Sequence, residues 1–386
     1  MSDNKIAITG WGSISPLGDN SAIIWECYSD NRSYFSIREY CGTDTWCGTL
    51  SATDALKIDA LRLEKPAYKN LDPSVLYAMY ASRVAVLAAG WNSDTAFGIN
   101  LGSSRGATSS FEEYHSQFIH SGNSQVHPLT SPATTLGNIA SWVAADLAAN
   151  GPVISHSITC STALHAILNA VAWLRSGLCS RFLAGGSEAA LTAFTVAQMR
   201  ALKIYSSLED QYPCRSMESD KKQNSMILGE GAASFCLELN ADTALAYITG
   251  VGYSTEMISH GASISAEGLC LQRAMQMAIK NHDPDSVDVL IMHAPGTVKG
   301  DASEMNAVEA VFGAKKPLLT SNKWKIGHTF GASGALSLEM ALLMLEHDRF
   351  IQPPYLEPQE QRSPLKKILI NAVGFGGNAV SILVEK

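Results

Sequence analysis

Cys160 is the residue whose type and position most plainly allow covalent chemistry in this chain. The apolar run at 152–159 predicts a strand, and the helix expected after it carries an apolar stripe of Leu164, Ile167, Leu168, Val171 and Leu174. Cys160 is therefore expected at or beside a helix N-terminus, where unpaired N–H groups and the helix dipole favour a thiolate. The same N–H groups could hold the oxyanion of an acyl-transfer intermediate. A buried cysteine that only caps a core helix is the alternative, and position alone does not decide between them.

Two histidines stand where α/β proteins place functional groups. A strand expected at 287–292 delivers His293 into a loop shaped by proline and glycine, and His328 comes just before the small residues at 331–335. A lone histidine at a strand end is more often structural than catalytic, and the glycines could serve helix packing instead. With Cys160, however, the two histidines would supply a nucleophile and two imidazoles, the groups that covalent acyl transfer uses.

A fourth motif, Gly374-Phe375-Gly376-Gly377, places one aromatic residue among three glycines. Such a loop can move Phe375 or present its backbone N–H, although a plain β-turn would have the same composition.

The elements that must position these residues alternate along the chain. Strands are expected at 5–10, 96–102, 152–159, 180–185, 232–239, 245–253, 287–292, 317–321, 367–373 and 379–384. Helices are expected at 74–92, 131–149, 161–176, 188–203, 264–281, 302–312 and 331–347. This alternation predicts an α/β fold with buried sheets.

One short strand is repeated. Ala7-Ile8-Thr9-Gly10-Trp11-Gly12 recurs as Tyr247-Ile248-Thr249-Gly250-Val251-Gly252, and each copy opens one half of the chain. Matches of this length arise by chance, so the repeat by itself leaves a duplication open. A duplicated chain would have two similar α/β halves with the site where they meet.

Composition limits the class of protein. The 386 residues are 46% hydrophobic with a net charge of −8, which predicts two domains or one large two-part unit and no nucleic-acid or anionic-membrane surface. No apolar run approaches the roughly 18 residues of a membrane span, and the N-terminus has no leader pattern, so we expect a cytoplasmic protein. The eight cysteines form no C-x-x-C pair and no zinc-spaced cluster, so neither a disulfide framework nor a metal site is expected.

The motifs together resemble the β-ketoacyl-acyl-carrier-protein synthases, in the elongating (type I/II) branch of the thiolase superfamily. The resemblance rests on Thr-Cys-Ser before a helix, His-x-x-Gly-Thr, Lys-x-x-x-Gly-His-Thr-x-Gly-Ala-Ser-Gly and Gly-Phe-Gly-Gly, in matching order and spacing. It runs from residue 5 to the C-terminus and is weakest over 28–95. It implies the five-layered αβαβα thiolase fold made of two related halves, 1–240 with the nucleophile and 241–386 with both histidines. The family is typically homodimeric.

The resemblance also implies roles. Cys160 would accept an acyl chain from an acyl carrier protein, while His293 and His328 would support decarboxylation of a malonyl thioester. The resulting carbanion would attack the acyl-enzyme to give a 3-ketoacyl product and carbon dioxide. Lys323 and Glu304 would form a buried ion pair that orients the second histidine. No metal or organic cofactor is implied, since the substrate brings its own phosphopantetheine arm.

The remaining site residues implied by the resemblance surround this centre. Phe375 would be the gate, and its N–H with that of Cys160 would form the oxyanion hole. Gly374 and Gly376 flank the gate and would contact substrate, and Thr297 resembles a pantetheine contact.

Four departures from the family pattern surround the same sulfur. Pro295 cannot supply a threonine hydroxyl, 220–226 lacks the usual Arg-Asp-Gly-Phe, and Asn378 stands in place of a threonine. Arg105 occupies a position that in relatives is near the acyl pocket, and it needs an anionic or polar partner because an unpaired buried charge costs several kcal/mol. These departures indicate a specialised fatty-acid, polyketide or polyene pathway; aryl-polyene precursors are one possible substrate.

Rival activities fit less well. A thiolase would carry a second catalytic cysteine, but no cysteine follows Cys270. The initiating synthases pair their cysteine with histidine and asparagine, whereas both positions here are histidine. A cysteine hydrolase would need water as acceptor, which nothing here requires. A chain-length-factor-like subunit that partners a separate ketosynthase would usually lack the cysteine, and it remains the alternative function.

Overall fold

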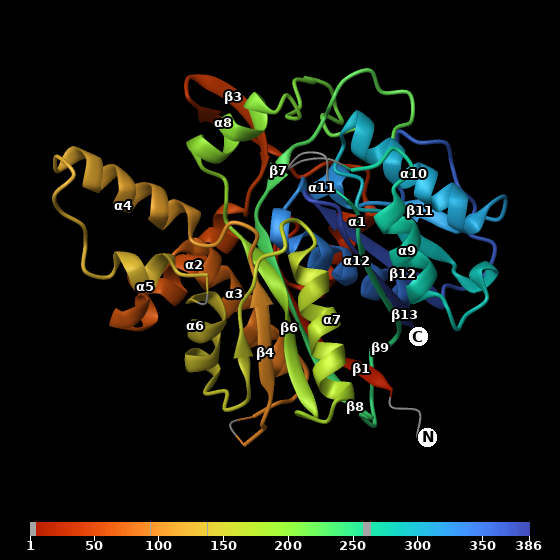
Figure 1. Cartoon of the computed structure of the whole chain (residues 1–386), viewed down its shortest axis with the longest axis horizontal. Helices are drawn as coiled ribbons and strands as arrows, with labels where there is room; N and C mark the ends of the chain where they lie inside the picture. The colour runs from red at the N-terminus through yellow and green to blue at the C-terminus, as the bar shows by residue number, and fades with distance from the viewer. Residues whose placement is uncertain (1–4, 93, 137, 258–263) are drawn as a thin grey trace.

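The computed structural model describes residues 5–92, 94–136, 138–257 and 264–386. Within these residues ten strands form one hydrogen-bonded sheet in the order β11-β10-β12-β13-β9-β1-β8-β6-β4-β5 (Figure 1). Their bounds, in sheet order, are β11 Leu318–Thr320, β10 Val289–Ile291, β12 Lys367–Gly374, β13 Asn378–Glu385, β9 Ala246–Thr255, β1 Ile6–Ile14, β8 Gly231–Leu239, β6 Arg181–Glu188, β4 Gly98–Gly102 and β5 Val153–Ile154.

The sheet consists of two matching sets of five strands. In the first set β1 and β6 run antiparallel to β8, and β4 and β5 continue parallel to β6. In the second set β9 and β12 run antiparallel to β13, and β10 and β11 continue parallel to β12. The sets join where β1 pairs with β9, with Ile6 opposite Ile248. These are the two repeated strands, so the expectation of two related halves is confirmed. The division into 1–240 and 241–386 falls between β8 and β9 and stays a prediction.

Helices form three layers around the two strand sets. One outer layer packs on the first set, a middle layer contacts both sets, and the other outer layer covers the second set (Figure 1). They contain, respectively, α3 (Pro73–Ala88) with α6 (Asn138–Leu147), α7 (Thr162–Arg175) with α12 (Ser333–His347), and α9 (Leu269–Ala278) with α10 (Val298–Phe312). Helix α12 is buried from Ser333 to Leu345, as a central layer requires. The expected αβαβα order is thus confirmed.

Smaller elements surround these layers. Three strands form a second sheet, in the order β2 (Ser36–Tyr40), β3 (Thr43–Gly48) and β7 (Leu228–Gly229). The remaining helices are α1 (Ser21–Ser29), α2 (Ala52–Glu64), α4 (Thr108–His120), α5 (Thr130–Thr134), α8 (Ala193–Ala201) and α11 (Lys323–Ile326). Short 3-10 turns lie at Pro66–Tyr68, Pro284–Ser286 and Phe330–Ala332. None of the described helices has the length and apolar content that crossing a bilayer would need.

The structure differs from the expected elements in several places, and it contains elements that were not expected: α1, α2, α4, α11, β2, β3 and β7. The helix expected at 131–149 is two helices, α5 and α6, and residue 137 between them lies outside the described residues. Helix α4 projects from the body (Figure 1) with only Thr108 buried, although Phe111 and Ile119 give it an apolar face. The strand expected at 152–159 pairs only at Val153–Ile154, because the chain then turns sharply before Cys160.

Candidate active site

Cys160 lies between strand β5 and helix α7. Ser161 is the N-terminal cap residue of α7, so the predicted position beside a helix N-terminus is confirmed. The cysteine is 5% exposed and packs with Phe330 and Met226. Its position depends on Thr159, which has a φ of +48° although it is β-branched. A β-branched residue reaches that conformation only when surrounding contacts impose it.

Similar backbone strain accompanies both histidines. Ala294 directly follows His293 with a φ of +26°, and Phe330 comes two residues after His328 with a φ of +41°. Strained positions of this kind cost about 1–3 kcal/mol each and gather at functional sites. Each strained residue therefore lies next to, or two residues after, one of three candidate site residues: Thr159 adjoins Cys160, Ala294 adjoins His293, and Phe330 follows His328.

The structure brings Cys160, His293 and His328 together. The cysteine sulfur and one ring nitrogen of each histidine all lie within 4.8 Å of one another. The two imidazole rings meet edge to face with centroids 5.1 Å apart. Cysteine and histidine can also bind a metal such as zinc, and the expectation that the chain binds none stays a prediction.

The ionisation of Cys160 differs from the sequence expectation. Burial raises the pKa of its thiol to about 12, and the charge of Glu188 adds to the effect. Lys323 and Arg105 lower this pKa but do not offset the loss of water. Burial therefore acts against the thiolate that the helix N-terminus was expected to favour.

His328 is held as a neutral imidazole in one tautomer. The backbone N–H of Phe330 donates to its Nδ1 at 3.2 Å, and Ser333 Oγ lies 2.9 Å from the same atom. Since Nδ1 accepts, the ring proton is on Nε2. Burial, with the nearby Lys323 charge, lowers the pKa of His328 to about 3. His328 can therefore donate a hydrogen bond without carrying a positive charge.

His293 is positioned through its backbone. Glu304 accepts the N–H of His293 at 2.9 Å and that of Ala294 at 2.8 Å. Asn371 Nδ2 donates to the same carboxylate at 3.0 Å. Burial, followed by the charges of His328 and Lys323, lowers the pKa of His293 well below its usual value.

The expected ion pair between Lys323 and Glu304 is wrong in this structure. Among the described residues no ion pair within 4 Å includes Lys323, whose Nζ donates to Asn322 Oδ1 at 3.2 Å. The Glu304 oxygens are taken by the N–H groups that fix His293, so they orient the first histidine rather than the second. Burial lowers the pKa of Lys323 to about 8, while the Glu304 charge acts in the opposite direction. The ammonium affects both imidazoles at a distance.

Glu188, at the end of β6, was not marked as functional by the motifs. Its carboxylate accepts hydrogen bonds from Ser103 Oγ at 2.8 Å and from the N–H groups of Ser104, Arg105 and Gly331 at 2.8, 3.2 and 2.9 Å. It therefore joins the loop after β4 to the segment after His328. The available signal was a carboxylate ending a strand of small residues. Burial raises the pKa of Glu188 to about 7.

The Gly374–Gly377 turn joins β12 to β13 and lies against Cys160. Gly377 N–H donates to Gly374 O at 3.1 Å, so the β-turn alternative describes its backbone correctly. A Cβ on Gly374 would overlap Thr159 Oγ1 and lie 2.9 Å from the Cys160 nitrogen. Gly376 adopts a φ of +89°. Phe375 is 40% exposed, and its carbonyl oxygen accepts from Thr159 Oγ1 at 3.4 Å, so it lies next to the residue before Cys160, a position that suits a gate.

Replacing Gly374 by alanine should lower kcat by about 10²-fold, the usual effect of losing one oxyanion donor, because the turn must move away from Cys160. Steady-state kinetics and alkylation of Cys160 would be measured together. Gly122→Ala is the control for backbone strain at an exposed turn after α4, since its Cβ position is open but its φ is +70°. A normal kcat for Gly374→Ala would contradict the role given to the turn.

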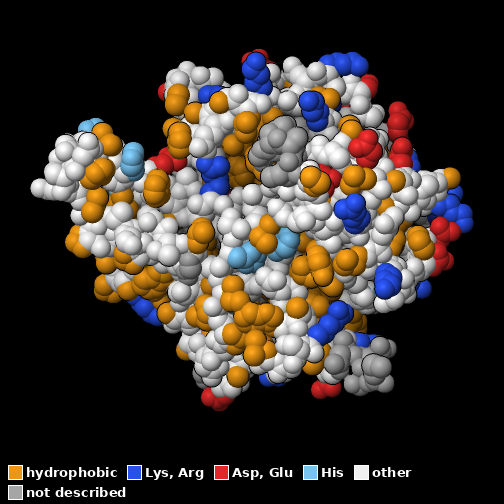
Figure 2. Space-filling model, viewed as in Figure 1, with side chains coloured by type: hydrophobic (Ala, Val, Ile, Leu, Met, Phe, Trp, Pro, Cys, Tyr) orange, Lys and Arg blue, Asp and Glu red, His pale blue; other side chains and the backbone are white. Residues whose placement is uncertain are grey.

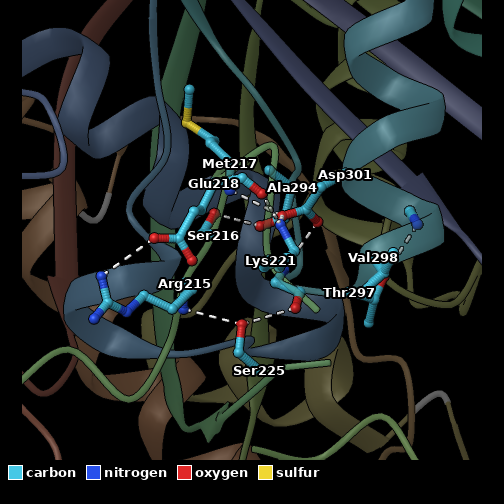
Figure 3. Close-up of polar contacts among 12 residues, drawn as sticks. Arg215, Ser216, Met217, Glu218, Lys221, Ser225, Ala294, Thr297, Val298 and Asp301 are labelled. Atoms are coloured by element: carbon cyan, nitrogen blue, oxygen red, sulfur yellow. Dashed lines mark hydrogen bonds and ion pairs between the residues drawn. The ribbon is translucent and has the colours of Figure 1, made fainter. Parts of the chain in front are cut away.

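The segment 214–225 holds the loop that follows His293 through hydrogen bonds and an ion pair (Figure 3). Ser216 Oγ donates to Ala294 O at 2.6 Å, and Ser225 Oγ donates to Gly296 O at 2.9 Å. Asp301 accepts the Gly296 N–H at 3.0 Å and pairs with Lys221 at 2.7 Å. Lys221 and Ser225, which make two of these contacts, lie in the 220–226 stretch that lacks Arg-Asp-Gly-Phe.

Thr297 lies at the other end of this loop. Its hydroxyl accepts the Gly300 N–H at 3.2 Å and so caps helix α10. The pantetheine contact implied for Thr297 stays a prediction. Because the hydroxyl oxygen already accepts the Gly300 N–H, the hydroxyl would make this contact as a hydrogen-bond donor.

Replacing Lys221 by methionine should lower the free energy of unfolding by about 3 kcal/mol, because it leaves the Asp301 carboxylate buried without its counter-charge. The side chains are only 4% and 5% exposed. Denaturant unfolding would measure the effect, with the exposed neighbour Lys222→Met as control. Adding Asp301→Asn should recover part of the loss; an unchanged wild-type stability in Lys221→Met would refute the role of the pair.

Arg105 finds a polar partner rather than an acidic one. Its Nη2 donates to Gln198 Oε1, and its guanidinium lies over the Phe330 ring at 5.5 Å from the centroid. Arg105 was expected to have an anionic or polar partner, and the neutral amide of Gln198 is that partner.

A two-part thiolase-like fold with a buried cysteine and two neutral histidines defines a class of condensing acyltransferases. Family comparison identifies this class directly. The N-terminal domain model of beta-ketoacyl synthases matches residues 3–243, and the C-terminal domain model matches residues 245–356. The chain belongs to the beta-ketoacyl synthase family and is an acyl-transferring enzyme.

Individual relatives agree with this assignment. The chain is 28% identical to 3-oxoacyl-[acyl-carrier-protein] synthase 2 of Staphylococcus aureus strain COL, over 100% of this chain and 99% of that protein. It is 30% identical to Nodulation protein E of Rhizobium leguminosarum bv. trifolii, over 93% and 91% of the two chains.

Solved structures agree with the fold. The ishigamide ketosynthase/chain length factor covers 99% of both chains with a TM-score of 0.87 at 20% identity. A type II polyketide acyl-carrier protein in complex with its ketosynthase, bound to the hexaketide, gives 0.86 at 22%, again over 99% of both chains.

Proposed function

We propose that this β-ketoacyl synthase carries out decarboxylative Claisen condensation, joining an acyl chain on Cys160 to a malonyl unit and giving a 3-ketoacyl product on an acyl carrier protein. The observation that carries the proposal is the clustering of the Cys160 sulfur and the two histidine nitrogens within 4.8 Å. Covalent capture divides one difficult step into two easier ones.

In the first half-reaction the Cys160 sulfur attacks the carbonyl carbon of the acyl thioester. The bond from that carbon to the phosphopantetheine sulfur breaks, and the thiol proton leaves with the departing phosphopantetheine thiol. The negative oxygen that forms between attack and collapse is held by the N–H groups of Cys160 and Phe375. The contact of Gly374 with the Cys160 amide supports this pairing of donors.

In the second half-reaction the malonyl thioester loses carbon dioxide and leaves an enolate. His328 donates Nε2–H to the enolate oxygen, and His293 supplies a second neutral donor. Neutral imidazoles suit this task, because a donor that stays uncharged does not protonate the carbanion. The enolate carbon attacks the acyl-enzyme, and Cys160 is expelled as a thiolate that takes up a proton from water.

The partners follow from the reaction. The substrates arrive on the phosphopantetheine of an acyl carrier protein, and we propose no metal or organic cofactor. The complex of a related ketosynthase with its carrier protein supports this choice of partner. We further propose a cytoplasmic homodimer acting in a specialised fatty-acid, polyketide or polyene pathway; the departures at Arg105 and 220–226 support the specialised role.

The alternative function is a chain-length-factor-like subunit that pairs with a separate ketosynthase. The similarity to a ketosynthase/chain length factor structure favours keeping it. The assembled Cys160, His293 and His328 favour catalysis instead.

Labelling separates the two functions. Incubation with acyl-carrier-protein thioesters of short, medium and unsaturated chains should add the acyl mass to the peptide that contains Cys160. Mass spectrometry of the digested protein would detect it. Absence of any labelled peptide across all donors would reject the catalytic function and favour the partner subunit.

A further inference from the structure

Arg105 stands between the Cys160 centre and an open groove. Its backbone N–H donates to Glu188, and its guanidinium lies over Phe330, which packs with Cys160. The Arg105 charge lowers the pKa of Cys160, which places the cation close enough to influence the sulfur. The residue is therefore held by its backbone while its side chain lies over Phe330, beside the Cys160 centre.

The guanidinium of Arg105 is only partly used. Among the described residues its side chain donates a hydrogen bond to the neutral amide of Gln198, and no carboxylate oxygen lies within 4 Å of its nitrogens. A guanidinium has five N–H donors, so most of them remain available. Both nearby acids are engaged elsewhere: Glu188 accepts backbone and serine donors, and Glu112 accepts Thr192 Oγ1 at 2.7 Å.

The groove beside Arg105 can accept a chain with a polar end. It has a volume of about 840 Å³ and follows one face of α4, closed by Phe194 of α8. Phe111, Ile119 and Phe194 are 59%, 52% and 59% exposed, so an apolar wall lies beside the cation. Figure 2 shows hydrophobic and histidine side chains gathered on this projecting arm. A plain alkyl end would cover the guanidinium without pairing it, which is costly.

We propose that Arg105 selects acyl donors whose chain bears a carboxylate at its far end, which the guanidinium binds at the edge of the groove while the methylene groups lie between Cys160 and Arg105, against Phe330. This inference rests on the proposed acylation of Cys160 and specifies its substrate class. Paired N–H donors fit the two oxygens of a carboxylate.

The test compares phosphopantetheine thioesters of equal chain length that end in a carboxylate, a methyl ester or a methyl group. Wild-type protein should acylate Cys160 with the carboxylate donor at a kcat/KM about 10- to 100-fold above the methyl donor, as expected for a charge-assisted hydrogen bond. Arg105→Met should remove this preference, and Arg105→Lys should restore part of it. The control is Arg273→Met, an exposed cation on α9.

The outcomes are distinguishable. Equal use of carboxylate and methyl donors by wild-type protein, with Cys160 still labelled, would overturn the selection and leave the condensation function standing. An equal fall for all donors in Arg105→Met would assign Arg105 to the phosphate that every donor shares, and would also overturn it. No labelling by any donor would reject the proposed function itself. Thermal melting of each variant separates these results from loss of folding.

Discussion

Replacing Cys160 by alanine should eliminate covalent acylation and reduce condensation by about 10⁴-fold or more. The thiol is the group that the two half-reactions share, so no other side chain can hold the chain between them. Intact-protein mass spectrometry would measure acylation, and release of the carrier-protein thiol would give its rate. The fold should survive, because alanine fills most of the same small buried space.

Cys270→Ala is the matched control for this substitution. Cys270 is also buried, and burial raises the pKa of its thiol to about 12, as for Cys160. It lies on α9, in the outer layer over the second strand set. Acyl mass retained by Cys160→Ala, or lost equally in Cys270→Ala, would show that the nucleophile had been misassigned.

Replacing His293 by alanine should lower malonyl decarboxylation by about 10²–10³-fold while Cys160 acylation survives. The reason is that the imidazole donates to charge that develops only in the second half-reaction. Carbon dioxide release from malonyl-carrier protein and acyl mass on Cys160 would be measured on the same preparation. The double readout also distinguishes a lost donor from a damaged fold.

The same measurement has a predicted pH profile. The pKa of His328 is lowered to about 3 and that of His293 also lies well below its usual value, so both rings stay neutral as pH falls through the range where free histidine becomes charged. Protonation of the two histidines should therefore not lower decarboxylation between about pH 8 and about pH 5. Any change of rate in this range is expected to come from Glu188 and Lys323, whose pKa values are about 7 and about 8. His282→Ala, a partly exposed histidine in the connection after α9, is the control for removing an imidazole. Equal loss of acylation and decarboxylation in His293→Ala would refute the division of labour.

Much of the fold could be predicted because its signals are local. Apolar runs and periodic stripes depend on neighbours in sequence, and they correctly indicated the strands around β1, β8, β9, β12 and β13. Helix α4 was missed although Phe111 and Ile119 give it an apolar face; in the structure only Thr108 of this helix is buried. The pattern of hydrophobic spacing also did not predict that the helix expected at 131–149 is divided into α5 and α6.

The sequence by itself determined which side chains could do the chemistry, since residue type and helix or strand ends are local properties. Cys160, His293 and His328 were identifiable in this way, and their motifs indicated the family. Only the tertiary structure decided their state, because burial and charge depend on residues far apart in the chain. Burial of Cys160 raises the pKa of its thiol, Glu304 holds His293 instead of pairing with Lys323, and Arg105 meets a neutral amide.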